Sequence, residues 1–241
     1  MARQRDAKLI GTVGNIIFYQ FRGEFCMRTK PVSVRRTGAS VKSGFNFGKA
    51  SKMSRQIRNL ISTINPCKSD NRVMCRLTGT LNKLISWKEK LNPATINKKD
   101  ALPYISGFQF NDRASLSEIW AIRVFVTQTG AGNLEITLDR FSPTQSLHAP
   151  NNTNRILFRL KLIGASLDDP ETKLIGTADL EIPFTAGLFQ PPPILMPDTS
   201  KQCDLKILVM AVQYMVNNKG IEELLTNKKK LPCGIVWAEW N

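Results

Sequence analysis

The chain has 241 residues, of which 42% are hydrophobic and 22% are charged, so it can build one or two packed domains and is not broadly disordered. Its net charge of +15 lies at one end. Residues 1–107 hold 21 Lys and Arg against 5 Asp and Glu (+16), whereas residues 108–241 hold 13 against 14 (−1). This asymmetry favours functions in which the first part of the chain contacts an anionic partner or another subunit.

The first predicted element is a β-hairpin over residues 11–31. Two stretches rich in aromatic and branched residues, 15–21 and 25–29, flank a turn that contains Gly23. Both faces of these strands are apolar, and a lone hairpin is marginal in water, so we expect it to dock. Packing on its own chain and pairing with a neighbouring subunit both stay open. The predicted subunit interface is Ile16, Ile17, Phe18, Tyr19, Phe21, Phe25 and Met27.

Two helices are predicted after a polar, basic connector. The first, about 41–64, places Met53, Ile57 and Ile61 on one stripe, and the second, about 71–91, does the same with Leu77, Leu81 and Leu84. Asn65-Pro66 ends the first helix. The short connection predicts an antiparallel αα-hairpin.

A breaker-rich linker, 93–107, precedes a change to period-two alternation. Strands are predicted near 120–126, 134–138, 156–163, 173–184, 205–216 and 235–240. The stretch 205–216 is apolar on both faces, which is typical of a central strand covered on both sides. The proline-rich stretch 191–200 is expected to be a loop that wraps a sheet edge or crosses between sheets.

These elements predict an α+β fold with an antiparallel β-sandwich. The predicted divisions are a basic arm with a β-hairpin at 1–40, a helical hairpin at 41–92, a linker at 93–107 and a β-sandwich domain at 108–241.

Sequence motifs for catalysis are missing. The chain contains no Walker loop, G-x-G-x-x-G, G-x-S-x-G or H-E-x-x-H. Its five cysteines are scattered and its only histidine is His148, so the sequence predicts neither a disulfide framework nor a metal site. The carboxylates Asp168, Asp169 and Glu171 are interpreted as a solvated turn. We expect no enzyme, no catalytic residue and no cofactor.

Basic residues form the second candidate site. Nine of them fall within 31 residues, with Phe45 and Phe47 among them. They could neutralise phosphates, form a solvated helix face, or match an acidic patch on another subunit. The set is Arg28, Lys30, Arg35, Arg36, Lys42, Lys49, Lys52, Arg55 and Arg58.

Membrane insertion and secretion are not indicated by the sequence. No run approaches the roughly 18 apolar residues that span a bilayer, and the first residues lack the pattern of a secretory signal. We therefore expect a cytoplasmic protein, or part of an assembly made in the cytoplasm.

Several spaced motifs resemble an uncharacterised family of bacterial proteins from Bacteroidota. The similarity follows the order of the chain over nearly its full length, so it supports the predicted architecture. It implies no activity, no metal site and no catalytic residue. The motifs are Gly11-Thr12-Val13-Gly14-Asn15, Arg28-Thr29-Lys30-Pro31, Arg35-Arg36-Thr37, Phe47-Gly48-Lys49-Ala50-Ser51-Lys52, Gly107-Phe108-Gln109-Phe110-Asn111 and Phe141-Ser142-Pro143.

Two functions follow from these observations. The leading hypothesis is a non-enzymatic structural subunit that assembles with copies of itself into a filament, shell or lattice, through its hairpin and basic helices. The alternative is a nucleic-acid-binding protein whose basic residues lie on phosphates. Expected partners are accordingly copies of the chain itself, or else nucleic acid or an acidic protein surface.

Overall fold

The computed structural model describes residues 3–5, 8–33, 35–64, 72–90, 102–119, 122–129, 133–198, 203–227 and 230–240. These residues form helices and antiparallel sheets, which confirms the predicted mixed α+β class. The chain divides into two compact units, Met1–Ser43 and Gly44–Asn241.

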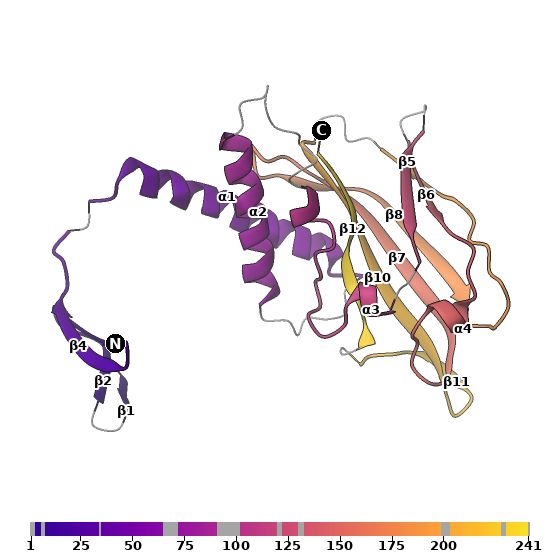
Figure 1. Cartoon of the computed structure of the whole chain (residues 1–241), viewed down its shortest axis with the longest axis horizontal. Helices are drawn as coiled ribbons and strands as arrows, with labels where there is room; N and C mark the ends of the chain where they lie inside the picture. Colours follow the sequence, from indigo (N-terminus) through magenta and orange to yellow (C-terminus); the bar gives the residue numbers. More distant parts are fainter. Residues whose placement is uncertain are drawn as a thin grey trace. The chain divides into compact units, whose positions relative to one another are not determined.

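A four-stranded antiparallel sheet makes up most of the first unit (Figure 1). Its strands, β1 (Arg3–Arg5), β2 (Lys8–Val13), β3 (Ile16–Phe21) and β4 (Glu24–Thr29), are neighbours in chain order. Strands β3 and β4 match the predicted hairpin, but β1 and β2 extend it into a larger sheet. Positive φ angles at Gly14 (58°), Arg22 (50°) and Gly23 (90°) produce the tight turns.

Helix α1 (Gly38–Ile61) begins three residues earlier than predicted because Thr37 caps it. The Thr37 hydroxyl accepts a hydrogen bond from the Ser40 N–H at 3.2 Å, which satisfies one of the helix's unpaired donors. Helix α2 (Val73–Lys90) follows, and the connection 65–71 lies outside the described residues. Asn46 of α1 donates to Glu89 of α2 at 2.9 Å.

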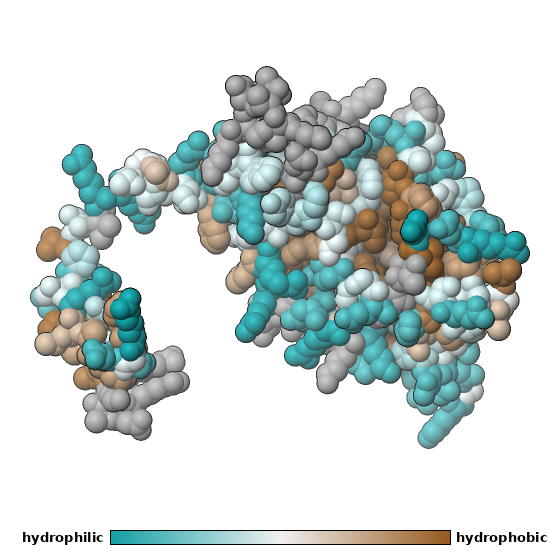
Figure 2. Space-filling model, in the orientation of Figure 1, coloured by the Kyte–Doolittle hydropathy of each residue, from teal (hydrophilic) through white to brown (hydrophobic). Residues whose placement is uncertain are grey.

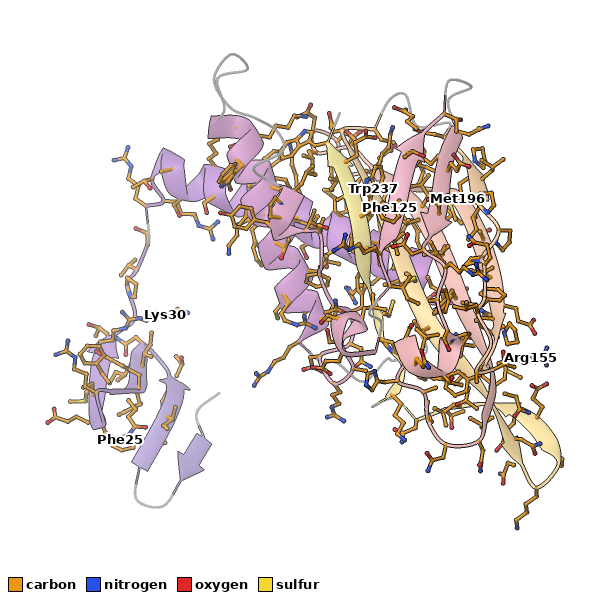
Figure 3. All side chains as sticks on the ribbon, turned by 45° about the vertical axis from the view of Figure 1, so that its right-hand side comes forward. Phe25, Lys30, Phe125, Arg155, Met196 and Trp237 are labelled. Carbon is orange, nitrogen blue, oxygen red and sulfur yellow. The ribbon has the colours of Figure 1, made fainter. Side chains whose placement is uncertain are left out.

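The two helices do not form the predicted antiparallel pair. In Figures 1 and 3, α2 crosses α1 instead of running alongside it. The apolar stripes explain this difference, because they pack on a sheet as well as on each other. Buried residues of both helices, including Met53 and Leu81, share one core with strands of a five-stranded sheet.

That five-stranded sheet contains β7 (Thr153–Ala165), β8 (Thr172–Pro183), β10 (Leu205–Asn218), β11 (Ile221–Leu224) and β12 (Cys233–Trp240). Its order is β11-β10-β7-β8, and β12 also pairs with β10. Strand β12 pairs with the first half of β10 and β11 with its last residues. Residues 205–214 are all buried, so β10 is the predicted central strand.

A three-stranded sheet contains β5 (Val124–Gln128), β6 (Asn133–Leu138) and β9 (Ile194–Pro197), in the order β5-β6-β9. Strand β9 lies in the stretch predicted as a loop, and as an edge strand it tolerates its neighbouring prolines. Two short helices, α3 (Leu116–Ile119) and α4 (Pro143–Ser146), complete the second unit. Residues 130–132, between two predicted strands, and residues 120–121, at the start of the first of them, lie outside the described residues.

Two cores cover opposite faces of the five-stranded sheet. Odd-numbered residues of β10, such as Ile207 and Val209, face the helices, and even-numbered ones, such as Met210 and Val212, belong to the core shared with the three-stranded sheet. This alternation follows the two-residue repeat of a strand. Helices, larger sheet and smaller sheet therefore follow one another as layers across Figure 1.

The last part of the predicted linker belongs to the helix-side core. Residues 93–101 lie outside the described residues, but Ile105 is fully buried and the Gly107 N–H donates to the Ile235 carbonyl at 2.8 Å. The helices, residues 102–111 and the five-stranded sheet therefore share one interior.

Candidate functional site

The two faces of the N-terminal sheet differ in chemistry. Residues opposite each other on antiparallel strands point to the same face, so the pairs Val13↔Ile16 and Phe18↔Met27 share one side. We call this side the apolar face. It comprises Leu9, Val13, Ile16, Phe18, Phe25 and Met27, interrupted by Gly11, Gln20 and Thr29.

The opposite, mixed face carries charge beside its apolar residues. It contains Ile17, Tyr19 and Phe21 from the predicted interface, together with Ile10, Cys26, Glu24 and Arg28. The Arg28 guanidinium lies 5.6 Å from the centre of the Tyr19 ring, a cation–π contact. The structure thus divides the seven predicted interface residues between two faces, with four of them, Ile16, Phe18, Phe25 and Met27, on the apolar face.

Side chains of this sheet lack an interior of their own. None of the described residues from Leu9 to Phe45 is buried. On the apolar face, Met27 is 72% exposed and Val13 is 52% exposed. Figure 2 shows brown, hydrophobic side chains gathered on this sheet. A sheet with a largely apolar face normally covers that face with another layer, so this face is the strongest candidate for an interaction site.

Leu9 and Val13 are functional candidates that the sequence interpretation missed. The sequence does contain a pattern that predicts the β2–β3 turn, because Gly14-Asn15 between two apolar residues is typical of a two-residue hairpin turn. The structure confirms that turn, since Val13 pairs with Ile16 across it.

The basic candidates are spread over both units. Arg28 lies on β4, Lys30 directly follows that strand, and Phe25 and Lys30 are labelled in Figure 3. Arg35 and Arg36 lie in the connector, and Lys42 lies at the start of α1. Lys49, Lys52, Arg55 and Arg58 continue along α1 in the second unit.

An exposed stripe on α1 joins aromatic and basic side chains. Val41, Phe45 and Phe47 are each more than half exposed. Val41, Phe45 and Lys49 follow at intervals of four residues, which places them on one side of the helix. The Lys49 ammonium lies 4.8 Å from the centre of the Phe45 ring.

The carboxylate group at 168–171 has a structural role. Lys88 of α2 forms ion pairs with Asp168 at 2.8 Å and with Asp204 at 3.1 Å, and so ties the helix to the loops beside the sheet. Burial alone would raise the pKa of Asp204, but the Leu167 N–H at 2.7 Å and the Lys88 ammonium outweigh it and lower the pKa.

The second unit also has a buried ion pair, in which Lys206 contacts Asp198 at 2.7 Å, and charged clusters at its surface. Arg155, labelled in Figure 3, binds the Glu222 carboxylate with two nitrogens and Glu181 with a third. His148 lies with Arg113, Glu118 and Lys230 around a surface pocket of about 260 Å³. Within the described ranges, no group of three or more His, Cys, Asp or Glu side chains is placed to hold a metal ion.

The helices that the structure describes are too short or too polar to cross a membrane. Comparison with known proteins gave no matching family model, no curated relative and no matching solved structure. The resemblance to a Bacteroidota family therefore stays a prediction.

Proposed function

We propose that this protein is a non-enzymatic structural subunit that assembles with copies of itself through the apolar face of its N-terminal sheet. One observation carries the proposal: six apolar side chains share a face that contains no charged residue, on a sheet without a buried residue from Leu9 onward. The second unit serves as the body of the subunit. We propose that its two sheets form a β-sandwich whose outer side carries the helices.

The free energy gained by covering this face can stabilise an assembly. Each Å² of apolar surface removed from water contributes about 25 cal/mol, so covering several large side chains contributes several kcal/mol. A surface of this kind on every copy brings subunits together at high protein concentration.

The test compares matched substitutions on the two faces of the sheet. Val13→Lys with Met27→Lys places two charges on the apolar face, and Phe21→Lys, at a position 58% exposed on the mixed face, is the control. Nuclease-treated full-length proteins are compared by sedimentation velocity and electron microscopy. We expect large assemblies in the wild type and in Phe21→Lys, and their loss in the double variant. Assemblies that persist in the double variant would rule out the apolar face.

Nucleic-acid binding is the second candidate, and the composition of the first 58 residues supports it. They contain 13 Lys and Arg against only Asp6 and Glu24, and Lys49 lies over the exposed ring of Phe45.

The two proposed functions differ in how binding depends on salt concentration. Affinity for phosphates falls steeply as salt rises, whereas apolar association does not weaken. Sedimentation at low and high salt, with and without added nucleic acid, therefore distinguishes them.

A further inference from the structure

Among the described residues, the second unit has a partly apolar groove beside the strands β5 and β12. A pocket of about 270 Å³ opens beside β5 and β12, with Met210 of the central strand β10 among its lining residues. Its apolar lining is Leu116, Ile122, Val124, Met210, Ile235 and Val236, and it contains no charged residue. Figure 2 shows a brown band where Figure 1 places β12 and β5.

Among the described residues, β5 is an edge strand, and β12 lacks a second neighbour only beyond Ile235. Strand β5 ends the three-stranded sheet. Strand β12 has β10 on one side, and on the other side residues 107–110 pair with its first part, Cys233–Ile235. Phe125 and Trp237, labelled in Figure 3, come from these two strands, and Phe125 is 44% exposed. A further strand could be added on this side, at the edge of β5.

We propose that β4 of a second copy of this chain covers the groove and places its apolar face over it. This inference rests on the proposed function and names the acceptor surface for the N-terminal sheet. Strand β4 is itself an edge strand, and alternate side chains, Phe25 and Met27, lie on the apolar face. An edge strand can pair its backbone with another sheet edge while alternate side chains enter a pocket.

The charge distribution supports this occupant. The groove lining and the apolar face both lack charged residues, so contact between them leaves no ion desolvated. With Met27 directed at the groove, Arg28 lies on the opposite side of β4 and stays in water. The connector 30–37 has eight residues, which can extend about 27 Å toward a neighbour.

The proposed contact has a consequence for symmetry. Donor sheet and acceptor groove are different surfaces, so each copy would offer one of each to its neighbours. Such head-to-tail contacts produce a ring if the rotation closes and a filament if it does not.

The test traps the contact between two differently tagged full-length copies, in a background of Cys26→Ser, Cys67→Ser and Cys75→Ser. One copy carries Met27→Cys and the other carries Ser117→Cys, because Ser117 is an exposed residue at the groove. The matched control carries Thr185→Cys, an exposed position outside the groove. After a short bismaleimide crosslink, we expect several-fold more covalent dimer with Ser117→Cys than with Thr185→Cys.

Three outcomes would overturn the proposal, and they differ in whether the proposed self-assembly still holds. Assemblies without preferential crosslinking at Ser117 would place the N-terminal sheet elsewhere and leave self-assembly standing. A full-length chain that carries both Met27→Cys and Ser117→Cys, and that crosslinks only within itself, would show that its own N-terminal sheet covers the groove. Absence of assemblies in the uncrosslinked wild type would remove the proposed function as well.

Discussion

Lys161, on the helix-facing side of β7, donates a hydrogen bond to the Thr63 hydroxyl just beyond α1, with 2.7 Å between Nζ and Oγ1. The same ammonium donates to the Leu60 carbonyl at 2.5 Å. The last carbonyls of a helix have no intrahelical donor and carry partial negative charge, so a cation is favourable there. Burial lowers the pKa of Lys161, which is only 7% exposed.

Lys161→Met should therefore loosen the end of α1 while keeping the apolar stem of the side chain. We expect the free energy of unfolding to fall by about 1–3 kcal/mol, because the Leu60 carbonyl and the exposed Thr63 hydroxyl lose a charged donor. Urea denaturation at neutral pH measures this, with the exposed Lys173→Met as the control. A variant as stable as the wild type would show that the desolvation of the ammonium cancels its hydrogen bonds.

Because of Asp204, we expect the free energy of unfolding to depend on pH in the acid range. Because its pKa is lower in the folded protein than its ordinary value of 3.8, its contribution is present above that pH and is lost as the pH falls through the folded pKa. Asp204→Asn should be less stable than the wild type at pH 7, and the difference should shrink as the pH falls below about 4. Urea titrations across this range test it, with Asp169→Asn as the control. A difference that does not change with pH would exclude the charge as its cause.

Gly164 of β7 is packed too closely for a side chain. A Cβ placed there would lie 2.5 Å from Cys203 Sγ and 2.9 Å from Ile175 Cδ1. Gly164→Ala should lower the free energy of unfolding by about 1–3 kcal/mol through overpacking. Adding Cys203→Ala removes the closest atom, so the double variant should recover part of the loss. Gly187→Ala, with no atom within 4 Å, should be neutral.

The shared helix-side core predicts which fragment folds. Residues 38–241 keep α1 and α2 on the sheet, so this fragment should be soluble and unfold in one cooperative transition. Residues 108–241 alone would expose Ile163, Ile207 and Val209 to water, and should aggregate or bind a hydrophobic dye. Expression of both fragments, followed by circular dichroism and dye binding, tests this. A stable, monomeric 108–241 would support the boundary predicted from the sequence.

Elements with strong periodicity were predictable from the sequence. The two helices, β10 and the hairpin β3–β4 follow from long apolar patterns, and their observed bounds differ by a few residues. Strand β2 was missed because Gly11 and Gly14 weaken the strand pattern there, so the first strand was predicted to begin at residue 15. Strand β11 has four exposed residues, so it has no buried face that could produce a pattern.

The candidate site required information that one sequence does not contain. Met27 and Arg28 lie on opposite faces because neighbouring residues of a strand alternate, which the sequence alone predicts. Leu9 and Val13 join the apolar face only because β2 pairs with β3, and one sequence does not predict that pairing. The groove depends on which strands end the two sheets. Long-range packing sets the order of the strands in each sheet, and the local sequence pattern does not show which strands lie at the edges.

From Leu9 onward the described residues of the N-terminal sheet include no buried one, which links the folding of the sheet to protein concentration. We expect its strands to gain most of their stability from the surface they contact, since a small uncovered sheet is marginal in water. Dilution would then lower the protection of its amides from hydrogen exchange, while the amides of β10, which lie inside the second unit, keep theirs at every concentration.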